Sequence, residues 1–86
     1  MDALEFIFTD SAFKHGIDKD AILGVIADPF LSKTHKSDDA ILVYGFDESG
    51  DAVEVIYDAQ RRVVFHAMRV NIVKLRKADG LRKDHS

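Results

Sequence analysis

A histidine and an arginine near the end of a predicted strand are the residues of this chain best suited to chemistry. His66 is the single polar residue on its face of the strand Val63–Met68, and an imidazole titrates near neutral pH, so it can act as a general acid or base. The alternative is a partly buried histidine whose ring nitrogens are satisfied by neighbouring groups. Arg69 follows, just before a helix that Asn71 can cap, and an arginine at a helix N-terminus is typical of a phosphate site. The alternative here is an arginine whose stem lies along the sheet edge.

The predicted last helix carries three basic residues on different faces, Lys74, Arg76 and Lys77. They can contact a nucleic-acid backbone without sequence specificity, or they are solvated positions near a helix C-terminus, where positive charge is favoured. His35 and His85 are expected at the surface. No histidine stands four residues from another and the chain has no cysteine, so no metal site and no cofactor are predicted.

The charge of the chain is divided between an acidic front and a basic end. Residues 1–60 contain 4 Lys and Arg against 13 Asp and Glu, a net charge of −9, and residues 61–86 contain 8 against 2, a net charge of +6. Together they give the net charge of −3. The basic end can meet an anion, such as a phosphate backbone or the carboxylates of a partner protein, whereas the acidic front argues against extensive binding to duplex nucleic acid.

Length and composition predict one folded domain over residues 1–86, with 81–86 as a flexible tail. With 47% hydrophobic and 31% charged residues, the composition is that of a folded soluble protein. The lack of cysteine excludes disulfides and thiol chemistry. Met1–Glu5 has neither the basic nor the apolar region of a signal peptide, and no apolar run approaches the roughly 20 residues of a membrane helix. We expect a cytoplasmic protein without membrane contact.

Hydrophobic periodicity predicts an α+β fold, in which two N-terminal helices and a C-terminal helix pack on a small antiparallel sheet. Gly16 is expected to end the first helical segment, and Pro29 the second. Gly24, inside the second helix, costs up to about 1 kcal/mol relative to alanine. The expected elements of this half are a strand at Leu4–Phe8, a helical turn at Ala12–Lys14 and a helix from Asp18 to Ala27.

The C-terminal half is predicted to be a meander of three or four strands, followed by the helix that Asn71 caps. In the last strand, regular alternation places Val64 and His66 on one face and Phe65 and Ala67 on the other. The strands are apolar on both faces, so the sheet face that the helices leave open needs a cover. The expected strands are Phe30–His35, Ala40–Phe46, Val53–Tyr57 and Val63–Met68.

Three short motifs occur in an order that resembles a known family. "FIFTDSAFKHGI" is a strand and short helix that end in Lys14-His15-Gly16-Ile17, "DKDAILGVIADPF" is a helix with an acidic cap followed by Asp-Pro, and "VVFHAMR" is a last strand with a histidine, an alanine and a basic residue. In order and length, residues 4–78 resemble the small bacterial BrnT-like toxins of type II toxin–antitoxin pairs, which have a RelE-like fold.

The resemblance implies a ribonuclease that stops translation and that a small DNA-binding antitoxin neutralises. Its chemistry needs no metal: a base removes the 2′-OH proton, that oxygen attacks the adjacent phosphate, a cation stabilises the added charge and an acid protonates the leaving 5′-oxygen. In this chain it makes Arg69 the candidate cation, His66 or His15 the acid or base, and Lys14 a phosphate contact. The alternative for His15 is a structural role, with its ring bonded to carbonyls at the helix end.

The chain departs from the family's pattern in its last strand. Met68 stands where the family often has an arginine, so the basic group is shifted to Arg69, on the opposite side of a regular strand. A different class of function also fits the residues. This is a non-catalytic binding module, whose basic end or open sheet face docks a partner protein or a second copy of the chain.

Overall fold

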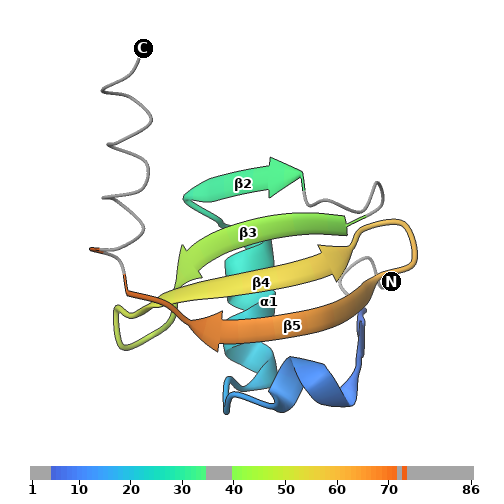
Figure 1. Cartoon of the computed structure of the whole chain (residues 1–86), viewed down its shortest axis with the longest axis horizontal. Helices are drawn as coiled ribbons and strands as arrows, with labels where there is room; N and C mark the ends of the chain where they lie inside the picture. The colour runs from blue at the N-terminus through green and yellow to red at the C-terminus, as the bar shows by residue number, and fades with distance from the viewer. Residues whose placement is uncertain (1–4, 35–39, 72, 74–86) are drawn as a thin grey trace.

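A five-stranded sheet with one α-helix behind it forms the body of the protein, as the computed structural model in Figure 1 shows. The structure describes residues 5–34, 40–71 and 73. The strands lie in the order β1-β5-β4-β3-β2, with β1 parallel to β5 and every other neighbouring pair antiparallel. The elements are β1 (Ile7–Phe8), the 3-10 helix η1 (Asp10–Phe13), α1 (Lys19–Ala27), β2 (Leu31–Thr34), β3 (Ala40–Phe46), β4 (Ala52–Asp58) and β5 (Val63–Arg69).

The predicted fold class, including its RelE-like arrangement of helices, is wrong. The described residues contain one α-helix and one 3-10 turn rather than two N-terminal helices, and they are mostly strand. The sheet is mixed, because Ile7 and Phe8 pair in parallel with Val63 and Val64. The first helical segment stays a single 3-10 turn, because Thr9 makes no side-chain cap and Gly16, at φ 79°, turns the chain away. The predicted C-terminal helix and the tail at 81–86 fall on residues outside the described ones.

The helix α1 confirms the prediction made for residues 18–27. The Asp18 carboxylate accepts a hydrogen bond of 2.8 Å from the backbone N–H of Ala21 and so caps the N-terminus. The helix ends at Ala27, ahead of Asp28 and Pro29, as the restriction on a residue before proline requires. No helix in the described ranges is long and apolar enough to cross a membrane.

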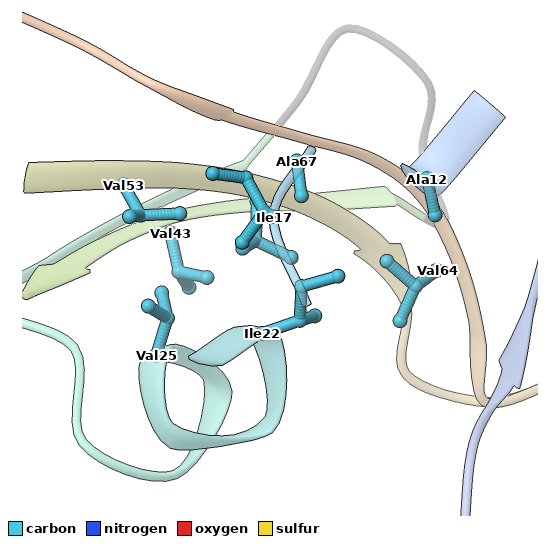
Figure 2. Close-up of a cluster of buried hydrophobic side chains, with 9 residues drawn as sticks. Ala12, Ile17, Ile22, Val25, Val43, Val53, Val64 and Ala67 are labelled. Carbon is cyan, nitrogen blue, oxygen red and sulfur yellow. The ribbon is translucent and has the colours of Figure 1, made fainter. Parts of the chain in front are cut away.

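The core lies on one face of the sheet, between the strands and the segments α1 and η1. Figure 2 shows valines of the central strands meeting side chains of α1, with Ala12 of η1 at the far end near β5. Burying such branched side chains stabilises the fold by roughly 1.5–3 kcal/mol for each fully buried side chain. The buried cluster consists of Ala12, Ile17, Ile22, Val25, Val43, Val53, Val55, Val64 and Ala67.

The opposite face of the sheet is the one turned to the viewer in Figure 1, where α1 lies behind the strands. No described helix covers it, and we call it the open face. Strand pairing assigns side chains to this face, because residues directly opposite each other on neighbouring strands point the same way. Its members on the three central strands include Leu42, Tyr44, Glu54, Ile56, His66 and Met68.

A β-bulge in β5 overturns the regular alternation predicted for that strand. Tyr57 of β4 pairs with Val64 but its neighbour Ile56 pairs with His66, so Phe65 is an extra residue. Val64 and Ala67, three positions apart, are therefore both completely buried in the core. The prediction that Val64 shares a face with His66 is wrong, because the bulge shifts the alternation by one residue.

Aspartates organise the two hairpin turns of the central strands. In the β3–β4 turn, one oxygen of Asp47 accepts hydrogen bonds of 2.9 Å from the backbone N–H groups of Ser49 and Asp51. In the β4–β5 turn, the buried Asp58 accepts a hydrogen bond of 2.9 Å from the backbone N–H of Arg61. That hydrogen bond to the ionised carboxylate is the main reason that the pKa of Asp58 is lowered.

The close approach of α1 to β3 makes a specific stability prediction. A Cβ atom at Gly45 would lie 3.1 Å from both the Cα and a methyl group of Val25, and the helix backbone can give way only by moving as a whole. We expect Gly45→Ala to lower the free energy of unfolding by about 1–3 kcal/mol, measured by urea denaturation. A Gly45→Ala variant as stable as the parent chain would show that α1 does not sit this close to β3.

A matched control comes from α1 itself. A Cβ atom at Gly24 would meet no atom within 4 Å. We therefore expect Gly24→Ala to raise the free energy of unfolding, by up to about 1 kcal/mol, through helix propensity alone. The two substitutions add the same methyl group and are expected to act in opposite directions.

Candidate active site

His66 lies on the open face of β5, immediately after the bulge, with its side chain 26% exposed. Its Nε2 atom is 2.9 Å from Oε2 of Glu54, a β4 residue whose side chain is 21% exposed. An ionised carboxylate only accepts hydrogen bonds, so Glu54 favours the tautomer of His66 with the proton on Nε2. Nδ1 of the neutral ring is then left as an acceptor, which is the state that a general base needs.

His15 is the second imidazole of the site, although 51 positions in the sequence separate it from His66. The centroids of the two rings are 5.7 Å apart and their planes are inclined at 76°, an edge-to-face contact. His15 is exposed and lies in the turn after η1, which packs against β5 through the buried Ala12. The structure thus brings together the two histidines that the resemblance offered as alternative candidates for the acid or base.

Tyr44 extends this cluster onto β3. It pairs directly with Glu54 across the strands, on the same face of the sheet. The Tyr44 side chain is buried. Burial raises the pKa of its phenol to about 12, with the neighbouring Glu54 carboxylate as a further cause. Tyr44 therefore stays protonated at neutral pH and adjoins Glu54 on the β3 side, whereas His66 adjoins it on the β5 side.

The sequence analysis did not identify Glu54 or Tyr44. Both look like ordinary members of amphipathic or apolar strands when they are read alone. The available signal is that Glu54 is the single carboxylate within the apolar strand Val53–Tyr57. Its match with His66 needs the strand register, which hydrophobic periodicity does not supply.

Arg69 is placed apart from the two histidines. It pairs with the buried Val53, so its side chain leaves β5 on the face of α1, opposite His66. The two positions are also three residues apart in the sequence, a rise of about 10 Å along the strand. The Arg69 guanidinium lies 3.5 Å from a carboxylate oxygen of Asp47 and 3.5 Å from one of Asp51. The catalytic role predicted for Arg69 thus gains no support from this placement, and it stays a prediction.

The remaining basic residues of the predicted site are placed only in part. Lys14 is exposed and directly precedes His15, at the end of η1. Lys74, Arg76 and Lys77 lie outside the described residues, as do His35 and His85. Within the described ranges, no hydrogen bond joins the His15 ring to a helix-end carbonyl, and no group of three or more acidic or histidine side chains could hold a metal ion.

Comparison with known proteins identifies no relative of this chain. No family model, no curated protein and no solved structure matches the chain.

The Tyr44–Glu54 contact can be tested by titrating the phenol. In a Tyr57→Phe variant Tyr44 is the one remaining tyrosine, and we expect its ultraviolet titration midpoint near pH 12 when folded, against about 10 in the unfolded chain. Because the folded pKa is the higher one, the stability from this group is complete below about pH 10 and is lost as the pH rises towards 12.

Glu54→Gln in the same background separates the causes of this shift. It removes the carboxylate charge, so the midpoint is expected to fall. It should stay above the midpoint of the unfolded chain, because burial is the largest cause. Equal midpoints in the folded and unfolded chains would contradict a buried phenol beside the Glu54 carboxylate.

Proposed function

We propose that this protein is a metal-independent endoribonuclease in which His15 and His66 are the acid–base pair. The observation that carries the proposal is the contact between the two imidazoles, 5.7 Å between centroids, next to a carboxylate that orients one of them. Cleavage of RNA through its own 2′-hydroxyl needs one group to accept a proton and one to donate a proton. Two neighbouring imidazoles on an accessible face meet that need without a metal ion.

We assign different roles to the two rings. His66 is the base: its Nδ1 takes the proton of the 2′-OH, and the imidazolium that forms is stabilised by Glu54 at 2.9 Å. The 2′-oxygen then bonds to the adjacent phosphorus as the bond to the 5′-oxygen breaks. His15, protonated and exposed, gives its proton to that leaving oxygen. The products are a 2′,3′-cyclic phosphate and a free 5′-hydroxyl, so protons and bonds balance.

Lys14 is the cation that we assign to the phosphate. It is exposed and adjoins His15 in the chain, so it can neutralise charge that develops on the non-bridging oxygens. Arg69 is less suited to this task on the open face, because it points to the other face and is held by Asp47 and Asp51.

The biological setting that we propose is the toxin of a type II toxin–antitoxin pair. It acts on cytoplasmic RNA and is held inactive by an antitoxin protein. The support is the sequence resemblance, together with the fact that His15 and His66, from two separate motifs of that resemblance, lie in contact. The fold expected from the resemblance is not part of this proposal.

Removing either imidazole should remove the activity. We expect His15→Ala and His66→Ala each to slow cleavage of a fluorescent single-stranded RNA, assayed in excess EDTA, by at least about 100-fold. Glu54→Gln should slow it less, because the imidazole remains and only its orientation and charge partner are lost. Products ending in a 2′,3′-cyclic phosphate are expected, and an RNA with a single 2′-deoxynucleotide at the cleaved position should stay intact.

His85→Ala is the matched control, since it removes a histidine that has no role in the proposal. Growth arrest and loss of total RNA on induced expression in a bacterium, relieved by the His15→Ala/His66→Ala double variant, would extend the result to the toxin role. Cleavage that survives the double variant would identify a contaminating nuclease. A folded protein that cleaves no RNA would favour the non-catalytic binding module instead.

A further inference from the structure

We propose that a pocket beside Arg69, together with the exposed rings of Phe30 and Phe46, is a docking site for a basic and apolar segment of a partner protein. An arginine side chain of that segment would enter the pocket, and its apolar neighbours would lie on the two rings. The site is separate from the His15–His66 pair, so it does not depend on the ribonuclease proposal.

The pocket has a volume of about 380 Å³ and lies between the N-terminal half of α1 and the β3–β4 turn. Asp18 and Asp20 line it from the helix side, and Asp47 and Glu48 line it from the turn. Arg69 is the one basic residue among the side chains that line it within the described chain. Four acidic residues and one arginine thus line the pocket, so the net charge of its lining is negative.

The Arg69 guanidinium already lies between two of the carboxylates near the pocket. Its Nε atom is 3.5 Å from a carboxylate oxygen of Asp47 and 3.5 Å from one of Asp51. Asp20 and Glu48 are exposed, and neither forms an ion pair within the described residues. A second cation that enters the pocket would therefore meet two carboxylates that are not engaged by Arg69. Arginine fits such a place well, because its planar guanidinium can bind more than one carboxylate oxygen.

Gly24 gives the pocket its space on the helix side. A glycine inside a helix costs about 1 kcal/mol relative to alanine, and packing does not demand it here, because a Cβ atom would meet no atom within 4 Å. Gly24 lines the pocket, so a large side chain at this position would occupy the space that a guest side chain needs.

Two exposed aromatic rings continue the site beyond the pocket. Phe46 lines the pocket and stacks on Phe30, with ring centroids 4.7 Å apart and planes inclined at 27°. Phe30 is 44% exposed and Phe46 is 51% exposed. Exposed ring faces bind the aliphatic stem and the charged head of an arginine, through apolar contact and cation–π attraction.

The charge decides between a protein segment and RNA as the occupant. Bare aromatic rings also stack on nucleotide bases, but a phosphate backbone at this site would lie against Glu48 and Asp51, both exposed. Those carboxylates repel phosphate and attract arginine and lysine. The combination of aromatic surface and negative pocket therefore favours a cationic protein segment.

The test is a titration followed by NMR with a blocked hexapeptide of alternating arginine and leucine as the probe. We expect saturable shifts confined to the backbone amides of residues 16–24, 46–51, Phe30 and Arg69, and none with the hexapeptide that has glutamate in place of arginine. Gly24→Phe should weaken binding by about tenfold or more by filling the pocket. The double substitution Asp20→Asn and Glu48→Gln should also weaken binding of the arginine peptide, because it removes two negative charges and leaves the size of the side chains unchanged.

Two control variants separate this site from the active site and from misfolding. Gly24→Ala adds only one methyl group and should keep most of the affinity, and His15→Ala with His66→Ala should bind like the parent chain. Shifts that do not saturate, shifts of equal size with the glutamate peptide, or binding unchanged in both pocket variants would overturn the proposal. Selective shifts of Phe30 and Phe46 with a single-stranded oligouridylate, and none with the arginine peptide, would also overturn it and assign the rings to RNA.

Discussion

One extra residue in β5, Phe65, determines on which side of the sheet the candidate active site lies. The core needs both Val64 and Ala67, which are three positions apart and therefore would point to opposite faces of a regular strand. The bulge at Phe65 allows both to be completely buried. The same shift turns His66 to the open face, where Glu54 of the neighbouring strand reaches its Nε2 atom. Packing of the core and orientation of the candidate base are thus two results of one backbone irregularity, and bulges often re-aim a side chain at a functional site in this way.

The one-sided architecture separates two kinds of surface. Because α1 and η1 pack on the same face, the open face is left for the cluster of Tyr44, Glu54 and His66, and the turn after η1 adds His15 from the edge of β5. Arg69 leaves β5 on the other face and lines the acidic pocket beside α1, where it pairs with Asp47. A chain of 86 residues can thereby carry a candidate active site on the open face and an acidic pocket beside α1. The two surfaces meet at the ring of Phe30, whose centroid is 6.3 Å from that of Tyr44.

The sequence predicts the local features of this fold well and its long-range pairings poorly. The cap at Asp18, the helix end before Pro29 and the strands β3, β4 and β5 follow from residue type and spacing, and the structure confirms them. Val63–Met68 is apolar on both faces, so its hydrophobic pattern does not show which residues point to the core. The bulge at Phe65 therefore could not be predicted from the sequence. The parallel pairing of β1 with β5 joins residues more than fifty positions apart. Glu54 and Tyr44 become recognisable as partners of His66 only when the register of three strands is known.

The central claim is that Glu54 holds His66 in the tautomer of a base while His15 lies against its ring. The most direct measurement is an NMR spectrum of the imidazole nitrogens of the 15N-labelled protein at a pH where His66 is neutral, together with a search for nuclear Overhauser effects between the two rings. The account predicts a proton on Nε2 of His66, none on Nδ1, and a cross-peak between ring protons of His15 and His66. A proton on Nδ1 of His66, or no contact between the rings in the folded protein, would contradict it.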